Sequence, residues 1–529
     1  MIYKKQKKII NAYESLLSQD KISLIHELKR KIHLIEFKKE DKLFFFFLNF
    51  NKLEFNQALR QKLCLLLLHR SFNSKVLISK HENISIVFCV PNEWLKAISE
   101  FCRVSKILSL IKFYFFIFIN GLKSIYKSTV WIYKLFTFRE NCDVKLKSYI
   151  LFNDLLYSNL PIVGNDDSNT IIDWYCDNYT EREKVEVISH TLKKEKYNYK
   201  NIIIVEEFNF LSIISFSKKI KILIFYIYQI FISIILFILG RWEYLLMIND
   251  ILKSKFYKDI SVDLLAREYL FSYSNLDYRP LWTYIVERRG AKVTFWAYAS
   301  SLSGMKKANG TYNFTDYAWE ISTWPTILVF TKMFKEYIEN IIIYKSKVLL
   351  FDTPIPNSDN ILPKTLFDRI KGKIVISMFD VSPTSDINAA LLLHDPKYRT
   401  FANGKKFISD ICEIFNDDIF FIILKIKRPI KKNFFYDTPY FDYLEVLTKI
   451  YNNVFLCHGD ISAEKIIRIS DLSISMPFTS TAFIASMKNV NTVFYDGSGL
   501  VQSDDINSQG IKLLSGKDQL LEFKKTIFK

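Results

Sequence analysis

Apolar residues in the first third of the chain recur at helical intervals, whereas later short apolar runs alternate with helix-like segments. One early set of four shares a single helix face: Leu24, Leu28, Ile32 and Ile35. The run 106–127 is strongly apolar but contains Lys112, and spanning a bilayer takes about 20 apolar residues. Residues 1–145 are therefore predicted to be mostly helical, with 106–127 as a buried or interfacial helix.

A second apolar run, 222–239, is longer and is broken only by Gln229 and Ser233. Three of the four residues before it are lysines. Its length lies at the threshold for a transmembrane helix, so two interpretations stay open, a core or interfacial helix and a true span. The lysines favour an interfacial helix on an anionic membrane face, where each basic residue contributes about 1 kcal/mol.

Strand–helix alternation begins near residue 146. Four short segments are apolar and β-prone, as expected of buried strands: 148–153, 169–174, 201–208 and 292–298. Two further segments predict helices: 182–194 and 280–290. The apolar strand that begins at 345 runs into Pro354 and Pro356, and proline ends both helices and ladders. A domain junction is therefore predicted near residue 355.

The alternation restarts after this junction. Five apolar segments predict strands: 373–381, 418–427, 453–459, 472–476 and 491–496. Four segments between them predict helices: 405–416, 439–451, 462–470 and 481–490. The expected fold class is α/β, with two Rossmann-like domains facing each other across a cleft, preceded by a mostly helical region. The predicted divisions are 1–145, 146–355 with the apolar insert 222–239, and 356–529.

Composition narrows the function. The 529-residue chain is 50% hydrophobic and 24% charged, which excludes a mainly disordered chain. Its net charge of +18 attracts anions, namely nucleic acid, an anionic membrane or phosphorylated small molecules. Without an RRM, a zinc-finger pattern or a long basic tract, nucleic acid is not expected as a partner. The seven cysteines are scattered without a CxxC pair and no secretory signal is evident, so we expect a cytoplasmic protein with no metal site.

The most informative motif lies at residues 471–499. Strand 472–476 is followed by the turn Pro477-Phe478-Thr479-Ser480 and then by a helix. The hydroxyls of Thr479 and Ser480 would meet unpaired N–H groups at a helix N-terminus, which is an anion-binding arrangement. The alternative is that Thr479 or Ser480 only caps the helix.

A second candidate is the basic end of strand 418–427. Lys425, Lys427 and Arg428 follow an apolar stretch, so their charges would reach the ligand-binding edge of the sheet, unless they form a solvated loop. His458 ends the neighbouring strand and is either a donor contact or a packing residue. Together with the hydroxyl turn, these residues predict a phosphate site.

These segments carry a resemblance to a known family. PFTSTAFIA (477–485), VFYDGSG (493–499), the KIKRP strand end and RPLWTY (279–284) resemble bacterial surface-polysaccharide biosynthesis proteins named for their PFTS motif. The C-terminal half is similar to GT-B glycosyltransferases, whose second domain binds a nucleotide-activated sugar. The resemblance covers roughly residues 150–529.

The resemblance implies a metal-independent glycosyltransferase of capsule or O-antigen assembly, without a cofactor. Its donor would be a nucleotide-activated sugar, and its acceptor a glycan or a lipid-linked molecule. Thr479, Ser480 and Thr481 match the donor-phosphate turn, and Asp496 lies in the matching FYD segment. The basic strand end resembles that of transferases using CMP-linked acidic sugars, but Arg428 stands where those have histidine, so its role would be electrostatic.

An inverting transfer would need a carboxylate base near the cleft. Asp277 is the first candidate because it lies with Asn275 and Arg279 in a turn that opens a helix, and the latter two are assigned to the acceptor side. Asp380, at a strand end of the second domain, and Asp173 are the other candidates.

Two rival functions remain. A sugar-nucleotide epimerase shares the two-domain fold but needs no acceptor. A non-catalytic membrane-associated component of a polysaccharide assembly complex would need the basic, apolar N-terminal third but not the phosphate turn. In each case the expected location is cytoplasmic and peripheral to the anionic inner face of the membrane.

Overall fold

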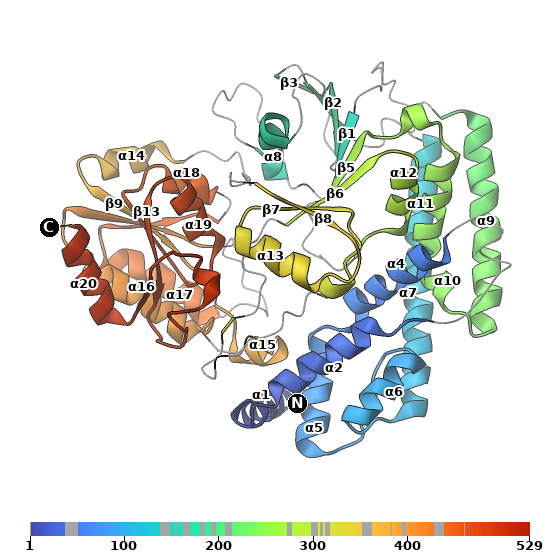
Figure 1. The fold of residues 1–529 in the computed structure, drawn as a ribbon, viewed down its shortest axis with the longest axis horizontal. Helices are drawn as coiled ribbons and strands as arrows, with labels where there is room; N and C mark the ends of the chain where they lie inside the picture. Colours follow the sequence, from blue (N-terminus) through green and yellow to red (C-terminus); the bar gives the residue numbers. More distant parts are fainter. Residues whose placement is uncertain are drawn as a thin grey trace.

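The structure of the protein is a computed structural model. It describes residues 2–37, 51–137, 149–153, 155, 157–161, 170–179, 186–190, 192, 197–200, 202–206, 214–271, 278–297, 305–306, 310, 312, 318–351, 362–381, 383–393, 398–427, 438–459 and 461–528. Within them, two Rossmann-like α/β domains follow a helical N-terminal region (Figure 1). The predicted fold class is confirmed in these respects.

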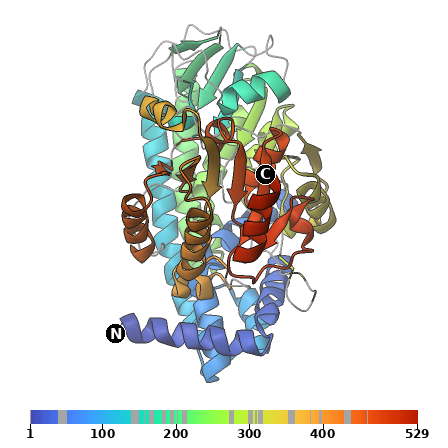
Figure 2. The same ribbon diagram turned by 90° about the vertical axis from the view of Figure 1, so that its left-hand side faces the viewer.

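The N-terminal region is helical, as predicted. Its helices are α1 (Ile2–Ser18), α2 (Ile22–Leu34), α4 (Lys52–Leu67), α5 (Arg70–Glu82), α6 (Asn92–Phe101) and α7 (Lys106–Thr137). Their buried apolar residues form one hydrophobic core with the helices of the first α/β domain. The region also contacts the second domain, because Asn73 Nδ2 donates to the Leu391 carbonyl at 2.8 Å. Figure 2 shows α1 crossing the base of the molecule beneath that domain.

The first domain contains an eight-stranded sheet. Its strands are β1 (Tyr149–Asn153), β2 (Val187–His190), β3 (Tyr197–Tyr199), β4 (Ile202–Glu206), β5 (Glu268–Phe271), β6 (Lys292–Trp296), β7 (Thr326–Val329) and β8 (Lys347–Leu350). They lie in the order β3-β4-β2-β1-β5-β6-β7-β8, and only β3 is antiparallel to its neighbour. Strands β2, β4 and β3 extend the sheet on one side of β1, and strands β5 to β8 extend it on the other side. The carboxyl ends of β1 and β5 therefore flank the topological switch point of this sheet.

Two predictions for this domain were wrong. Segment 182–194 contains strand β2, whose four residues are all buried in the sheet, so the tertiary burial overrode an apparent helical period. Segment 169–174 is not a strand. Thr170 and Asp173 form a capping box that starts the short helix α8 (Ile171–Trp174). The side chain of each residue accepts a hydrogen bond from the backbone N–H of the other.

Five further helices complete the first domain. They are α9 (Phe216–Ile238), α10 (Glu243–Leu246), α11 (Ile248–Asp259), α12 (Leu281–Arg288) and α13 (Lys332–Ile341). Helices α7 and α9 run antiparallel at the right-hand edge in Figure 1, since Phe237 contacts Tyr114 whereas Phe216 contacts Phe136. Helices α10 and α11 cover the inner side of this pair.

The second domain has a six-stranded sheet in which every strand is parallel. Its strands are β9 (Ile374–Phe379), β10 (Phe420–Lys425), β11 (Val454–Cys457), β12 (Leu472–Ser475), β13 (Asn491–Asp496) and β14 (Leu513–Ser515), in the order β11-β10-β9-β12-β13-β14. Its helices are α14 (Lys364–Ile370), α15 (Asp386–Leu391), α16 (Phe401–Ile414), α17 (Thr438–Ile450), α18 (Ala463–Ile467), α19 (Ser480–Met487) and α20 (Lys517–Ile527). This is the dinucleotide-fold strand order 3-2-1-4-5-6, in which ligands bind between the first and fourth strands.

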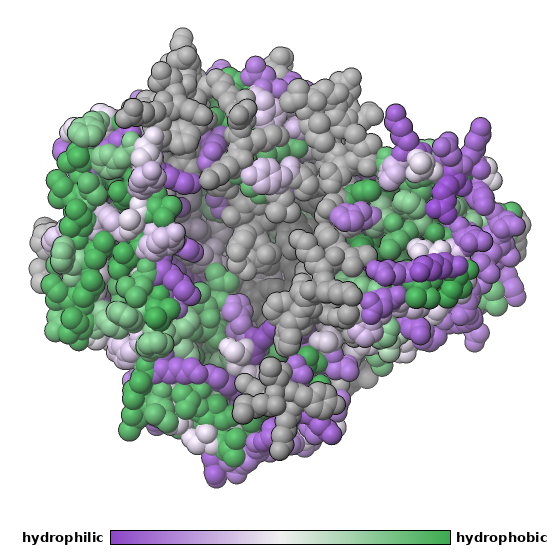
Figure 3. Space-filling model, turned by 180° about the vertical axis from the view of Figure 1, so that it is seen from behind, coloured by the Kyte–Doolittle hydropathy of each residue, from purple (hydrophilic) through white to green (hydrophobic). Residues whose placement is uncertain are grey.

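Among the described residues, α7 and α9 are the helices long and apolar enough to cross a bilayer. Their outward positions are mostly large apolar residues, whereas their buried positions mix apolar and polar side chains. The buried positions include Ser124, Ser128, Gln229 and Ser233. We call the outward side the α7–α9 apolar face, made of Ile107, Leu108, Ile111, Phe115, Phe118, Leu122, Tyr126, Val130 and Tyr133 on α7 and Phe216, Ile224, Ile227, Tyr228, Phe231, Ile234, Ile235 and Ile238 on α9. Hydrophobic side chains cover much of this edge in Figure 3.

Candidate functional site

The PFTS turn lies at the switch point of the second sheet. Strands β9 and β12 are neighbours there, with Phe379 aligned to Ser475, and the chain leaves in opposite directions on either side. The turn directly follows β12 and leads into α19. The sequence motif therefore occupies the place where an open α/β sheet binds its ligand.

Three hydroxyl groups gather at this turn. Thr481 Oγ1 lies 2.8 Å from Ser475 Oγ and 3.0 Å from Thr479 Oγ1. Thr479 Oγ1 also donates to the Met476 carbonyl at 2.9 Å. Thr479, Ser480 and Thr481 are half-buried. The turn thus presents polar groups that are held in place by one another and reach the protein surface.

The start of α19 lacks the expected cap. Thr479 occupies the N-cap position, but its side chain makes no capping hydrogen bond, because its hydroxyl points to Met476 and Thr481 instead. The capping-only alternative for Thr479 is therefore not what the structure shows. An uncapped helix N-terminus offers N–H donors and the positive end of the helix dipole to an anion.

Phe478 holds the turn in an unusual conformation. Its φ of 60° lies in the left-handed region, which a bulky residue rarely adopts. Its buried ring packs edge-on against Phe494 at a centroid distance of 5.7 Å. Such backbone strain costs of order 1–3 kcal/mol and is found most often at ligand sites, so the aromatic packing fixes the geometry of the hydroxyl groups.

Asp380 directly follows β9 at the same edge and is buried. It accepts a hydrogen bond from the Lys427 backbone N–H at 2.9 Å and another from the Tyr440 hydroxyl. Burial raises the pKa of Asp380 above its usual value, although both hydrogen bonds and the charges of Lys425 and Lys427 oppose the shift. A carboxyl group with a raised pKa at a ligand-binding edge is a candidate acid or base.

The basic strand end lies on the other side of β9 from the PFTS turn. Lys425 and Ser475 both align with Phe379, so one strand separates them, about 10 Å at the usual strand spacing. Buried Lys425 donates to the Gly459 carbonyl at 3.1 Å, on the β11 side. Lys427 is exposed, and Arg428 lies outside the described residues.

His458 and Asp496 end strands on opposite sides of this switch point. His458 follows the edge strand β11 and is exposed. Asp496 is buried and accepts hydrogen bonds from the backbone N–H groups of Ser498 (2.9 Å) and Val501 (2.8 Å), besides the Ser498 hydroxyl. Its two oxygens therefore order the turn after β13.

Asp173 is buried at the start of α8, in the first domain. Its carboxylate accepts from the Thr170 backbone N–H and hydroxyl (both 3.0 Å), from the Tyr199 hydroxyl (3.0 Å) and from Lys200 Nζ (2.9 Å). Burial raises the pKa of Asp173, but these hydrogen bonds and the Lys200 charge outweigh it and hold the pKa below its usual value. A carboxylate with a lowered pKa and both oxygens bonded is a weak proton acceptor.

Arg279 is also buried in the first domain. Its guanidinium donates to Thr283 Oγ1 at 2.9 Å, to the Thr323 carbonyl at 2.7 Å and to Glu287. It lies 3.8 Å from the centre of the Tyr284 ring. These contacts tie α12 to the chain near β7. Asn275 and Asp277, the other candidates in this turn, lie outside the described residues.

A cavity of about 470 Å³ opens at the switch point of the first sheet. Asn153 and Phe271, the last residues of β1 and β5 and aligned in the sheet, both line it. Four lysines from three helices also line it: Lys62 of α4, Lys123 and Lys127 of α7, and Lys253 of α11. Sequence reasoning missed this site, because its basic residues are nearly two hundred positions apart along the chain.

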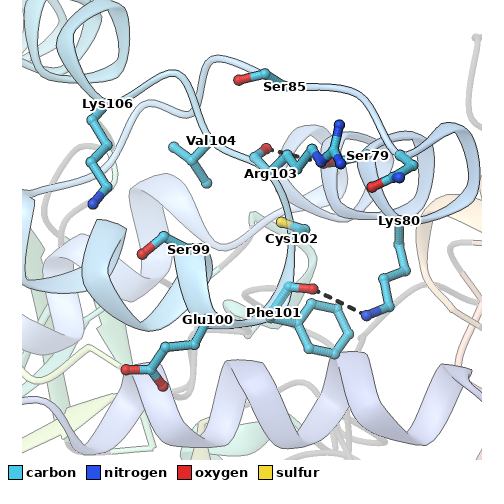
Figure 4. Close-up of a pocket in the computed structure, with 11 residues that line it drawn as sticks. Ser79, Lys80, Ser85, Ser99, Glu100, Phe101, Cys102, Arg103, Val104 and Lys106 are labelled. Carbon is cyan, nitrogen blue, oxygen red and sulfur yellow. Dashed lines mark hydrogen bonds between the residues drawn. The ribbon is translucent and has the colours of Figure 1, made fainter.

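A shallower groove of about 660 Å³ lies in the N-terminal region. Lys80 donates to the Phe101 carbonyl at 3.1 Å, and Figure 4 shows Arg103 above this bond and Lys106 on the opposite side of the groove. The groove is lined by α5, α6 and the start of α7 and by no strand of either sheet. It is therefore a less suitable place for the chemistry of an α/β enzyme.

A family comparison decides what kind of protein carries this turn. The family model described as polysaccharide biosynthesis PFTS motif protein matches residues 226–523. The chain belongs to this family. The match begins within α9 and includes the whole second sheet, so the uncapped turn between β12 and α19 is the motif that gives PFTS motif proteins their name.

Solved structures resemble this PFTS motif protein only weakly. The wall teichoic acid polymerase TagF matches with a TM-score of 0.34 and 11% identity, over 72% of this chain and 79% of TagF. Sucrose-phosphate synthase from Thermosynechococcus elongatus matches with a TM-score of 0.36 and 10% identity, over 72% and 90% of the two chains. No curated protein matches the chain. At these scores neither structure supports an argument about substrate, and the site must be interpreted from its own residues.

Within the described parts of the chain, no three histidine, cysteine, aspartate or glutamate side chains lie together as a metal site would require. The candidate phosphate contacts are instead hydroxyls, backbone N–H groups and lysines.

Proposed function

We propose that this PFTS motif protein is a glycosyltransferase that moves a sugar from a nucleotide-activated donor to a glycan or lipid-linked acceptor of a surface polysaccharide. The observation that supports it most is the uncapped PFTS turn at the switch point of the second sheet. Its hydroxyls and the N–H groups of α19 would bind the donor phosphates. Stabilising the negative charge on the departing nucleotide is the main catalytic task in such a transfer.

The chemistry requires one proton acceptor. The bond between sugar and phosphate breaks, the nucleotide leaves, and the acceptor oxygen bonds to the sugar while its proton passes to a carboxylate. Asp380 has the raised pKa and the position beside the turn that this role needs. Asp277, in the first domain, is the alternative base. A CMP-linked acidic sugar is one donor that the basic residues Lys425, Lys427 and Arg428 would suit.

A transfer assay tests this function. The purified full chain should release nucleotide from one of a panel of UDP-, GDP- or CMP-linked sugars and attach the sugar to a glycan or lipid-linked acceptor, and only when acceptor is present. Conversion of the donor without acceptor would identify an epimerase instead. Absence of both reactions and of nucleotide binding would leave a non-catalytic assembly component.

We further propose that the protein lies on the cytoplasmic face of the membrane with α7 and α9 parallel to its plane. Basic residues flank both ends of the α7–α9 apolar face, Arg103 and Lys106 at one end and Lys218 and Lys221 at the other. This combination is typical of helices that bury one side among lipid head groups.

Hydrogen bonds on the inner side of the pair argue against a span. The Asn249 backbone N–H donates to Ser124 Oγ at 3.1 Å, and Gln229 Nε2 donates to the Ile248 carbonyl at 2.9 Å. Both bonds fix the middle of a long helix to α11. If α7 and α9 crossed the bilayer, α11 and its lysines would enter the hydrocarbon layer, which costs several kcal/mol for each charge.

Vesicle binding tests the membrane proposal. Replacing Phe115 and Phe231 with aspartate should weaken binding to anionic vesicles by at least about tenfold, since each buried aromatic ring contributes roughly 1.5–3 kcal/mol. High salt should also loosen the wild-type protein because it screens the lysines. Unchanged binding of the aspartate variant, or extraction by detergent with no effect of salt, would contradict an in-plane attachment.

A further inference from the structure

The cavity at the first sheet's switch point is strongly basic. Lys62 is paired with Asp250, whose Oδ2 lies 2.7 Å from its Nζ. Among the described residues, no ion pair includes Lys123, Lys127 or Lys253. The cavity therefore carries three lysine charges beyond the one that Asp250 balances, and it lies where an open α/β sheet binds ligands.

Asp250 is fully engaged inside the protein. Its other oxygen accepts a hydrogen bond from the hydroxyl of the half-buried Tyr278. Burial raises the pKa of Asp250, but the Lys62 charge and hydrogen bond and the Tyr278 hydrogen bond hold it below its usual value. The carboxylate thus fixes Lys62 in the cavity wall and leaves the remaining lysines to an anion from outside.

The cavity adjoins the α7–α9 apolar face. Lys123 and Lys127 directly follow Leu122 and Tyr126, which are exposed on that face. One residue turns an α-helix by about 100°, so α7 presents an apolar stripe to the outside and a basic stripe to the cavity beside it. A molecule with an apolar chain and an anionic head would contact both stripes at once.

We propose that this cavity binds the phosphate or diphosphate head group of a membrane lipid that serves as the acceptor, with its hydrocarbon chain in the bilayer under the α7–α9 apolar face. That this lipid is the acceptor of the transfer rests on the proposed function. That the cavity binds a lipid phosphate rests on the residues of the cavity alone. Lysine ammonium groups suit phosphate as point charges. A soluble phosphate compound would bind the lysines in the same way, but it has no hydrocarbon chain to contact the adjoining apolar stripe.

The test compares two double variants with equal loss of charge. Lys127→Gln/Lys253→Gln removes two lysines of the cavity, one on α7 and one on α11. Lys292→Gln/Lys347→Gln removes two exposed lysines that do not line it, at the amino ends of β6 and β8 on the opposite edge of the sheet. Each full-length protein is mixed with phosphatidylcholine vesicles containing either a polyprenyl phosphate or phosphatidylglycerol, matched in surface charge, and inorganic pyrophosphate is titrated separately by calorimetry.

We expect the wild type to prefer the polyprenyl phosphate vesicles. The cavity variant should lose roughly tenfold or more of this binding, as expected from lost charge-assisted contacts, while the control variant keeps the preference. Equal losses in the two variants, or no preference in the wild type, would overturn the proposal. Tight pyrophosphate binding without a vesicle preference would do so too, because the site would then be one for a soluble phosphate.

The same proteins separate this inference from the proposed function. Nucleotide affinity should be unchanged in the cavity variant, since the donor turn is in the other domain. If no sugar transfer is found but the vesicle preference and its loss in the cavity variant remain, the glycosyltransferase proposal fails and the lipid-phosphate site stands.

Discussion

Replacing Thr481 with valine is expected to weaken binding of the nucleotide-activated donor by roughly ten- to hundredfold and to reduce transfer accordingly. Thr481 Oγ1 connects the Ser475 and Thr479 hydroxyls, so its loss removes one contact and releases two others. A hydrogen bond to a charged group contributes about 1.5–3 kcal/mol, and about 1.4 kcal/mol corresponds to a factor of ten. Valine keeps the volume of the side chain, so the fold should persist.

Thr492→Val is the matched control for this experiment. Thr492 lies near the amino end of β13, at the opposite edge of the sheet, and its buried hydroxyl has no hydrogen-bond partner among the described residues. Removing it should leave affinity unchanged and stability unchanged or higher. Calorimetry with UDP, GDP and CMP, and their sugars, measures the effect. Equal affinity of Thr481→Val and the wild type would show that the turn only starts α19.

Arg279→Met is expected to lower the free energy of unfolding by about 2–4 kcal/mol, because each buried polar group that loses its hydrogen-bond partner costs about 1–3 kcal/mol. The buried Thr323 carbonyl and Thr283 hydroxyl would lose a donor, and Tyr284 would lose the cation above its ring. Arg279→Lys should recover only part of this, because an ammonium group cannot replace the planar fork.

Urea unfolding monitored by circular dichroism measures the change. Arg288→Met provides the control, since Arg288 is exposed and pairs with Glu54 at the surface, where an ion pair contributes about 0–1 kcal/mol. The sequence placed Arg279 on the acceptor side of the site. That role would be supported if Arg279→Met kept its stability but raised the acceptor KM.

Sequence patterns predicted the second domain better than the first. Every position of β10 and β12 is buried. The apolar run FFIIL in β10 and the alternating Leu472 and Ile474 in β12 make this character visible in the sequence. Strand β2 is equally buried, but charged residues precede and follow it in the sequence. The spacing of apolar residues in segment 182–194 therefore resembled that of a helix. The capping box of α8 was missed because the apolar pair Ile171–Ile172 suggested a strand.

Other features depend on contacts between distant segments. The order β10-β9-β12 separates Lys425 from the PFTS turn by one strand, which no property of either segment determines. The left-handed backbone at Phe478 follows from its packing on Phe494, a residue of the next strand. Likewise the basic cavity of the first domain brings Lys62, Lys127 and Lys253 together only when α4, α7 and α11 pack against one another.

The position of α7 and α9 in the sequence determines when their shared apolar face can form during synthesis of the chain. The two helices that form the apolar face are separated in sequence by strands β1 to β4, and a ribosome delivers the N-terminal helix first. Until α9, α10 and α11 emerge, α7 has neither its antiparallel partner nor Asn249, which bonds its buried Ser124 and Ser128. The α7–α9 apolar face is therefore complete only after half of the first sheet has been synthesised, so the membrane attachment that we propose would follow folding of this domain rather than guide it.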